Sequence, residues 1–129
     1  MRLVNIGLGE MADRLSILAL KVAHGGEAGK DTTHFVTERN ALLSQVRSYE
    51  LAGAAEWLFE LSAVNAMLWH AEDDLRGYRD RCPKGAESAA DLQAVWVIAF
   101  RIQSLNDRRA ELVWALNKQA GTDLGQEKL

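Results

Sequence analysis

Acidic residues recur in three parts of the chain, and their carboxylates are the groups best suited to hold a divalent cation. Glu10 and Asp13 lie near the start, Glu72 and Asp73 near the middle, and Asp107 near the end. Carboxylates from different helices can converge inside a bundle and bind Mg²⁺ or Mn²⁺. Such a site would support hydrolysis of a nucleotide or a sugar-phosphate. A metal-dependent hydrolase is therefore one candidate function.

Basic residues accompany these acids and permit an interpretation without a metal. Arg14 and Lys21 share a helical stripe with the first two acids, and Arg76 follows Glu72 by four residues. On a solvated helix face, such ion pairs contribute little to stability. In a cleft between helices, the same residues would form a charged wall. The three histidines lie on three different segments and add no metal-ligand pattern.

A tryptophan and several amides continue the polar pattern on the later segments. Asn65 and Trp69 precede the central acids at steps of four and three, and Asn106 and Asn117 share a face of the last segment, beside Arg109. Trp69 could stack on a planar ligand or pack between helices. Amides on a packing face must be hydrogen-bonded, and they could set helix register as buried Asn does in coiled coils.

The stretch VNIGLGEMA raises the question of a phosphate-binding turn, because Gly7-x-Gly9-x-x-Ala12 fits a dinucleotide fingerprint. That fingerprint needs a strand before it, several parallel strands after it, and an acid about 20 residues later. The best candidate acid, Glu38, follows Gly9 by 29 residues, and further strands are missing. The alternative is that the two glycines let the chain turn into a helix whose first turn carries Glu10, where an acid suits the helix dipole.

The spacing of apolar residues predicts four helices that must position these side chains. The predicted helices run from Gly9 to His24, from Asp31–Thr33 to near Gly53, over roughly 28 residues ending near Arg81, and from Ser88 to Ala120. Gly25 and Gly26 are expected to end the first helix, and Ser88 with Asp91 predicts a capping box at the last. The two long helices should fold back as a hairpin against which the first two pack. Wide apolar faces on long helices favour a homodimer.

Length and composition bound the function classes. The 129 residues are most simply one domain, 1–129, with a core of its own, and the net charge of −3 gives no reason to expect nucleic acid as a partner. No apolar run approaches the ~20 residues that cross a bilayer, and no export signal is recognisable. One cysteine, Cys82, fits a reducing compartment. We therefore expect a cytoplasmic protein without a membrane partner.

Three stretches, GEMADRLSILALK, LWHAEDDLR and NDRRAELVWALN with the tail GTDLGQEKL, together resemble a family of small bacterial domains of unknown function. Its members begin Gly-Glu-x-x-Asp-Lys-x-Thr-Ile-Leu, contain Leu-Trp-x-x-Glu-Asp-x-x-Arg, and end with Asn-Asp-x-Arg-Ala, a later Asn and a Glu-Glu-Lys-Ser-Tyr tail. The resemblance implies an all-helical domain linked to surface-glycan metabolism. This chain departs from the pattern at Arg14, Ser16 and Val113, and its tail lacks the final Ser-Tyr.

The polar set that the resemblance implies largely coincides with the residues chosen by helical spacing. It comprises Glu10, Asp13, Arg14, Lys21, Trp69, Glu72, Asp73, Arg76, Asn106, Asp107, Arg109 and Asn117. We predict an all-α antiparallel bundle of about four helices with a long C-terminal hairpin, in which most of these side chains approach one another. The first functional hypothesis is a binding or assembly module without a cofactor, whose partner is a second copy, another protein or a small phosphorylated ligand. The alternative is the hydrolase, with Mg²⁺ or Mn²⁺.

Overall fold

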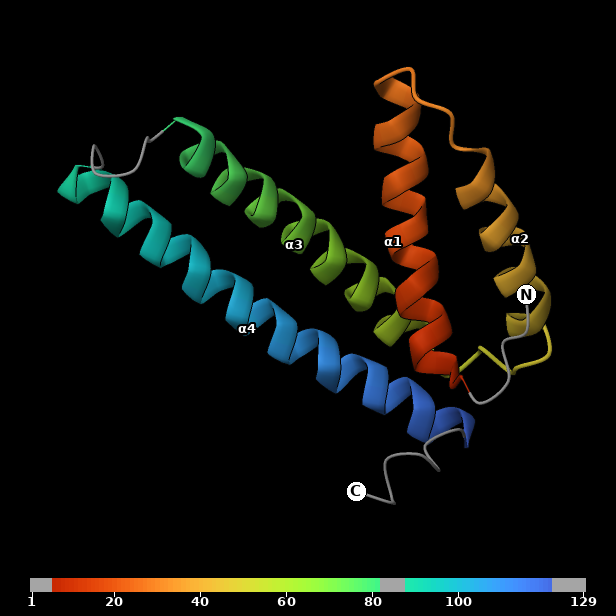
Figure 1. Cartoon of the computed structure of the whole chain (residues 1–129). Helices are drawn as coiled ribbons and strands as arrows, with labels where there is room; N and C mark the ends of the chain where they lie inside the picture. The colour runs from red at the N-terminus through yellow and green to blue at the C-terminus, as the bar shows by residue number, and fades with distance from the viewer. Residues whose placement is uncertain (1–5, 82–87, 122–129) are drawn as a thin grey trace.

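Four helices form the protein, as a computed structural model of residues 6–81 and 88–121 shows (Figure 1). They are α1 (Leu8–Glu27), α2 (Thr33–Val46), α3 (Ala55–Arg81) and α4 (Ala89–Ala120). Helices α3 and α4 run antiparallel as a long hairpin, α1 lies against both of them, and α2 lies beside α1. The predicted all-α fold with a C-terminal hairpin is confirmed. Neither described range contains a strand, which excludes the dinucleotide-binding fold.

The first helix continues through the two glycines that were predicted to end it. Gly25 and Gly26 are both helical, and the residue with a left-handed backbone is Gly29, at φ 71°. The backbone N–H groups of Gly29 and Lys30 donate to the carbonyls of Gly26 and Gly25, which is the pairing of a Schellman motif. The helix therefore ends where a glycine can reverse the chain with these carbonyls satisfied, three residues after the predicted His24.

The second helix is shorter than predicted and packs only on α1 among the described helices. It ends at Val46, where the sequence predicted helix to near Gly53. Tyr49 still contacts the α1–α2 core from the turns that follow, so its apolar spacing reflects packing rather than helix. The expectation that both early helices pack on the hairpin is wrong for α2. Helix α1 lies between α2 and the hairpin and contacts both.

The hairpin is buried only near one end. Its core is formed by Leu61, Val64 and Leu68 of α3 with Leu112 and Leu116 of α4, and Ala12 of α1 joins it. The predicted capping box at Ser88 and Asp91 is present, and Gly121, at φ 71°, ends α4. The Pro83–Gly85 turn and Cys82 lie outside the described residues.

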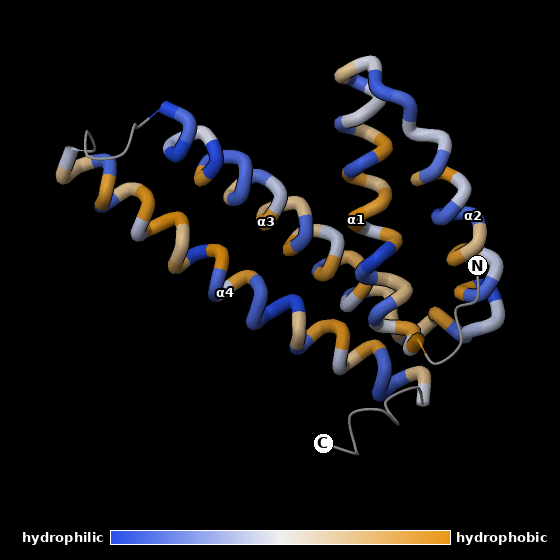
Figure 2. Tube along the Cα trace, viewed as in Figure 1, coloured by the Kyte–Doolittle hydropathy of each residue, from blue (hydrophilic) through white to orange (hydrophobic). Residues whose placement is uncertain are grey.

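The rest of α4 leaves large apolar side chains in solvent. All fully buried residues of α4 lie between Leu112 and Asn117, so the helix from Ala89 to Glu111 buries none completely. Apolar segments nevertheless recur along its whole length, including the part that extends beyond α1 (Figure 2). Among the described helices, none is long and apolar enough to span a membrane.

Candidate functional site

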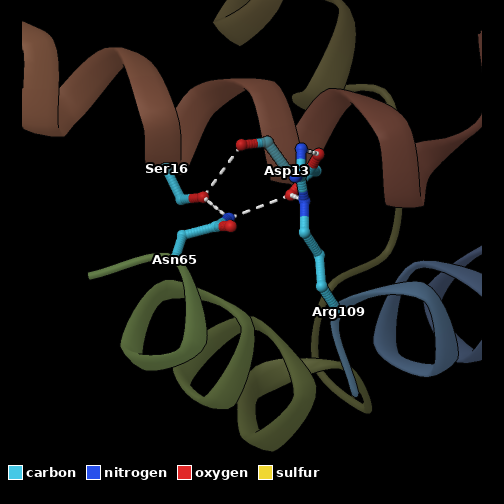
Figure 3. A network of polar contacts seen from close by, with 4 residues as sticks. All are labelled: Asp13, Ser16, Asn65 and Arg109. Carbon is cyan, nitrogen blue, oxygen red and sulfur yellow. Dashed lines mark hydrogen bonds and ion pairs between the residues drawn. The ribbon is translucent and has the colours of Figure 1, made fainter. Parts of the chain in front are cut away.

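A polar network joins three helices around Asp13 (Figure 3). Arg109 of α4 donates to both carboxylate oxygens of Asp13 of α1, from Nε at 2.8 Å and from Nη2 at 2.5 Å. Asn65 of α3 donates its Nδ2 to Asp13 Oδ1 at 2.9 Å and to the Ser16 hydroxyl at 2.5 Å. Ser16 in turn donates to the Asp13 carbonyl. One carboxylate thus ties α1 to both arms of the hairpin.

The electrostatics of this network keep Arg109 charged. Its hydrogen bonds to Asp13 raise the pKa of the guanidinium above its ordinary value, against the opposing effect of burial. The negative charges of Asp13 and Glu72 act in the same direction. A cavity of about 340 Å³ opens beside the pair, and Asn106, Ala110 and Val113 complete its lining. Because Asp13 occupies two donors of Arg109, this pair joins α1 to α4.

A second network caps the start of α1. Gly7, at the N-cap position, offers no side chain, and Asn117 of α4 replaces it. The Asn117 Oδ1 accepts the N–H of Gly9 at 2.6 Å, and its Nδ2 donates to both oxygens of Glu10, at 3.0 and 2.8 Å. Asn117 is 1% exposed, so the hydrogen bond between its side-chain amide and the helix terminus is shielded from water. The predicted register-setting amide is Asn117, and it acts as an N-cap from another helix.

The glycines of VNIGLGEMA are explained by close packing around this cap. A Cβ built on Gly9 would overlap the Val113 carbonyl oxygen and lie 2.8 Å from the carbonyl carbon. A Cβ on Gly7 would lie 2.7 Å from a Glu10 oxygen and 2.8 Å from Asn117 Cγ. The small residues therefore admit the backbone of α4 and its capping amide. No phosphate is needed to account for them.

Other predicted site residues belong to separate contacts. Arg14 donates to both oxygens of Glu38 on α2, at 2.6 to 2.9 Å, and does not pair with Glu10. Lys21 lies over the Phe35 ring of α2, 5.2 Å from its centroid. These two cations therefore hold α2 against α1, away from the Asp13 network. The prediction that Arg14 joins the shared cluster is wrong, and Lys21 also lies outside it.

The central segment is similarly divided. Trp69 stacks on His24 of α1 with ring centroids 4.7 Å apart and planes 9° from parallel, which fits the second of its two predicted roles, packing between helices. Asp73 and Arg76 form an exposed ion pair within α3. Asp107 is exposed and has no ion pair or hydrogen bond within the described chain. The structure thus brings Asp13, Arg109 and Asn106 around one cavity, where the charge of Glu72 also acts on Arg109, and it brings Glu10 to Asn117 in another place.

Several contributors to these contacts were absent from the predicted site. Asn65, Ser16, Glu38 and His24 each contact a residue that was in it. Asn65 was singled out by its helical spacing with Trp69 and Glu72, although it is not among the twelve residues of the predicted set. Ser16, Glu38 and His24 lie at helix positions without a distinctive pattern. Their contacts arise only because a neighbouring helix packs beside them.

The described residues contain no group of three or more His, Cys, Asp or Glu side chains placed to hold a metal ion. The metal-dependent hydrolase required three carboxylates facing one cavity without basic partners. Asp13 is instead paired with Arg109 and Asp73 with Arg76, while Glu10 accepts from an amide. In the part of the chain that the structure describes, these acids therefore join neighbouring side chains within and between helices.

We expect the Asp13–Arg109 pair to show a coupling energy on the order of 1 kcal/mol in a double-mutant cycle with alanine. The carboxylate is 15% and the guanidinium 33% exposed, which places the pair between surface and buried ion pairs. Urea unfolding of the two single variants and the double variant measures it.

Glu60 and Arg108 provide the matched control for this cycle. They join α3 to α4 with the same bidentate geometry, but both side chains are more than 40% exposed. Their coupling should be smaller and should fall further when salt is raised. Equal couplings at high salt would mean that burial does not distinguish the two pairs.

No protein-family model, curated protein or solved structure matches this chain. The function must therefore be inferred from the geometry of the chain itself.

Proposed function

We propose that this protein is a helical assembly module that dimerises through the outward face of α4. The observation that carries the proposal is a set of exposed apolar side chains on that face. Trp96 is 66% exposed, Phe100 60%, Leu92 53% and Trp114 44%. These residues lie on the side of α4 opposite the leucines that contact α3 and α1. Trp96 and Phe100 contact each other, and the Lys118 ammonium lies over the Trp114 ring at 4.7 Å, but α1, α2 and α3 leave this face of α4 open within the described fold.

The exposed area is what a dimer needs. At ~150–250 Å² for a whole aromatic side chain, Trp96, Phe100 and Trp114 leave on the order of 350 Å² in water. Leu92 brings the face to roughly 450 Å². A standard interface buries about 800 Å² per partner, of which a homodimer's apolar share is about 65%. The face therefore supplies most of the apolar part of one standard interface.

A second copy is the occupant that fits this face best. A two-fold dimer pairs the same patch on both subunits, so the patch must be self-complementary. The face consists of one straight helix with aromatic residues towards both ends, and two straight helices can pack along their length. The polar networks of α1 support this role, because they fix α4 against α1 and α3.

Changing Trp96 and Phe100 together to glutamate should convert a dimer into a monomer. The substitutions place two like charges per subunit in the proposed contact, where they would be desolvated. Light scattering after size exclusion should give twice the protomer mass for the native chain and one protomer mass for the W96E/F100E variant. Circular dichroism should show the same helix content in both.

Phe59 supplies the matched control. Among the described residues it is the most exposed large apolar side chain, at 77%, but it lies on α3. Phe59→Glu should leave the dimer intact. A native chain that remains monomeric at all concentrations would overturn the proposal, as would a dimer that Phe59→Glu dissociates and the α4 variant does not.

The link to surface-glycan metabolism belongs to this proposal only as context. It depends on the sequence resemblance, and the polar networks offer no sugar-binding arrangement of their own. An assembly module would serve such metabolism by bringing two copies of a larger machinery together.

A further inference from the structure

The outward residues of α4 are arranged nearly symmetrically about Leu105. They follow one another at steps of four, four, three, four, three and four, which is the spacing of a packed helix seam. The seam comprises Leu92, Trp96, Phe100, Gln103, Asp107, Ala110 and Trp114, all of them exposed. Trp96 and Trp114 lie nine residues on either side of Leu105, Phe100 and Ala110 five residues, and Gln103 and Asp107 two residues.

We infer that two α4 helices pack antiparallel in the dimer, with the two-fold axis opposite Leu105. This inference rests on the proposed dimerisation through α4. In this register, Trp96 faces Trp114 of the partner subunit and Phe100 faces the partner's Ala110, a large residue against a small one. The Phe100–Ala110 contact has the difference in size that interdigitating side chains require, while the two tryptophans stack as an aromatic pair. The helix dipoles also oppose each other.

The register gives a role to Asp107, a predicted site residue that has no hydrogen bond or ion pair in the described chain. Its carboxylate faces Gln103 of the partner subunit, whose amide can donate a hydrogen bond to it. The two-fold axis repeats this contact, so two charge-assisted hydrogen bonds lie at the centre of an apolar seam. A polar layer inside an apolar seam fixes register, because a shift leaves its groups unpaired.

The parallel arrangement is worse on the same residues. It places Asp107 against Asp107 of the partner subunit, which sets like charges together in a partly desolvated seam. It also sets Phe100 against the partner's Phe100 and Ala110 against the partner's Ala110. Two large side chains then compete for one space, and two small ones leave a void. Both effects favour the antiparallel pair.

Distances between spin labels distinguish the two arrangements. Labels are attached to cysteine at Gln93 or at Ser104, both exposed on α4, in chains whose own cysteine is replaced by Cys82→Ser. In the antiparallel dimer, the labels at position 93 are separated by about 36 Å along the helix axis, at 1.5 Å per residue. The labels at position 104 lie across the axis, at the ~10 Å spacing of packed helices plus the length of the labels.

The expected result is a long distance at position 93 and a short one at position 104. Short distances at both positions would mean parallel helices, and long distances at both would mean another face or register. Either outcome overturns this inference but leaves a dimer in place. A monomeric mass with no dipolar coupling would overturn the proposed function itself. The mass of each labelled chain is measured first, so that a label that disrupts the dimer is recognised.

Discussion

Replacing Gly9 with alanine should lower the free energy of unfolding by about 2 kcal/mol, although alanine is the better helix former. The added Cβ would overlap the carbonyl oxygen of Val113, which is backbone and cannot rotate away. Helix α1 would have to move from α4, which would lengthen the hydrogen bond between the Gly9 N–H and Asn117. Urea unfolding monitored by circular dichroism measures the loss.

Gly77 is the matched control, since it is also a helical glycine, in α3, but a Cβ there would meet nothing within 4 Å. Gly77→Ala should raise stability by about 0.5–1 kcal/mol through helix propensity and a less disordered unfolded chain. The two substitutions are chemically the same and should have opposite signs. Equal effects at both positions would show that the close approach of α1 to α4 does not limit residue size.

The helices themselves were largely predictable, because apolar spacing reports which face of a segment is buried. The ends of α4 follow signals that lie within a few residues, the Ser88–Asp91 box and Gly121. The ends of α1 and α2 depend on more distant contacts. Gly25 is tolerated inside α1, and Tyr49 keeps an apolar spacing beyond α2 because it packs on α1 from a turn.

The candidate site was only partly predictable, because a helical wheel gives the direction of a side chain but not the neighbour it meets. Asp13 and Arg14 are adjacent in sequence and point 100° apart, so one meets α3 and α4 while the other meets α2. Asn106 and Asn117 share a face, yet Asn117 is buried and Asn106 is exposed, because only the end of α4 is covered. Which of the two amides is buried and hydrogen-bonded depends on where α1 crosses α4.

Replacing Asn117 with leucine should cost about 3 kcal/mol, the largest loss expected from one polar residue in this fold. Leucine has a similar volume, so the change removes hydrogen bonds and leaves packing nearly intact. The Gly9 N–H would then be buried without the acceptor that now lies at 2.6 Å, and Glu10 would lose its amide donor. Asn106→Leu, at an exposed amide of the same helix, should change stability by less than about 0.5 kcal/mol. Denaturant unfolding of both variants measures the difference.

Asn117→Asp separates the two functions of this amide. Its carboxylate can still accept from Gly9, but it cannot donate to Glu10, and two negative charges then face each other. Protonation of either carboxyl restores a donor, so the deficit of this variant relative to the native chain should shrink as pH falls from 7 towards 4. Asn117→Leu lacks a titrating group, and its deficit should depend less on pH. If the loss of stability of both variants stays constant over this pH range, Glu10 does not contribute to the cap. Asn117 would then stabilise the fold only through its hydrogen bond with the Gly9 N–H.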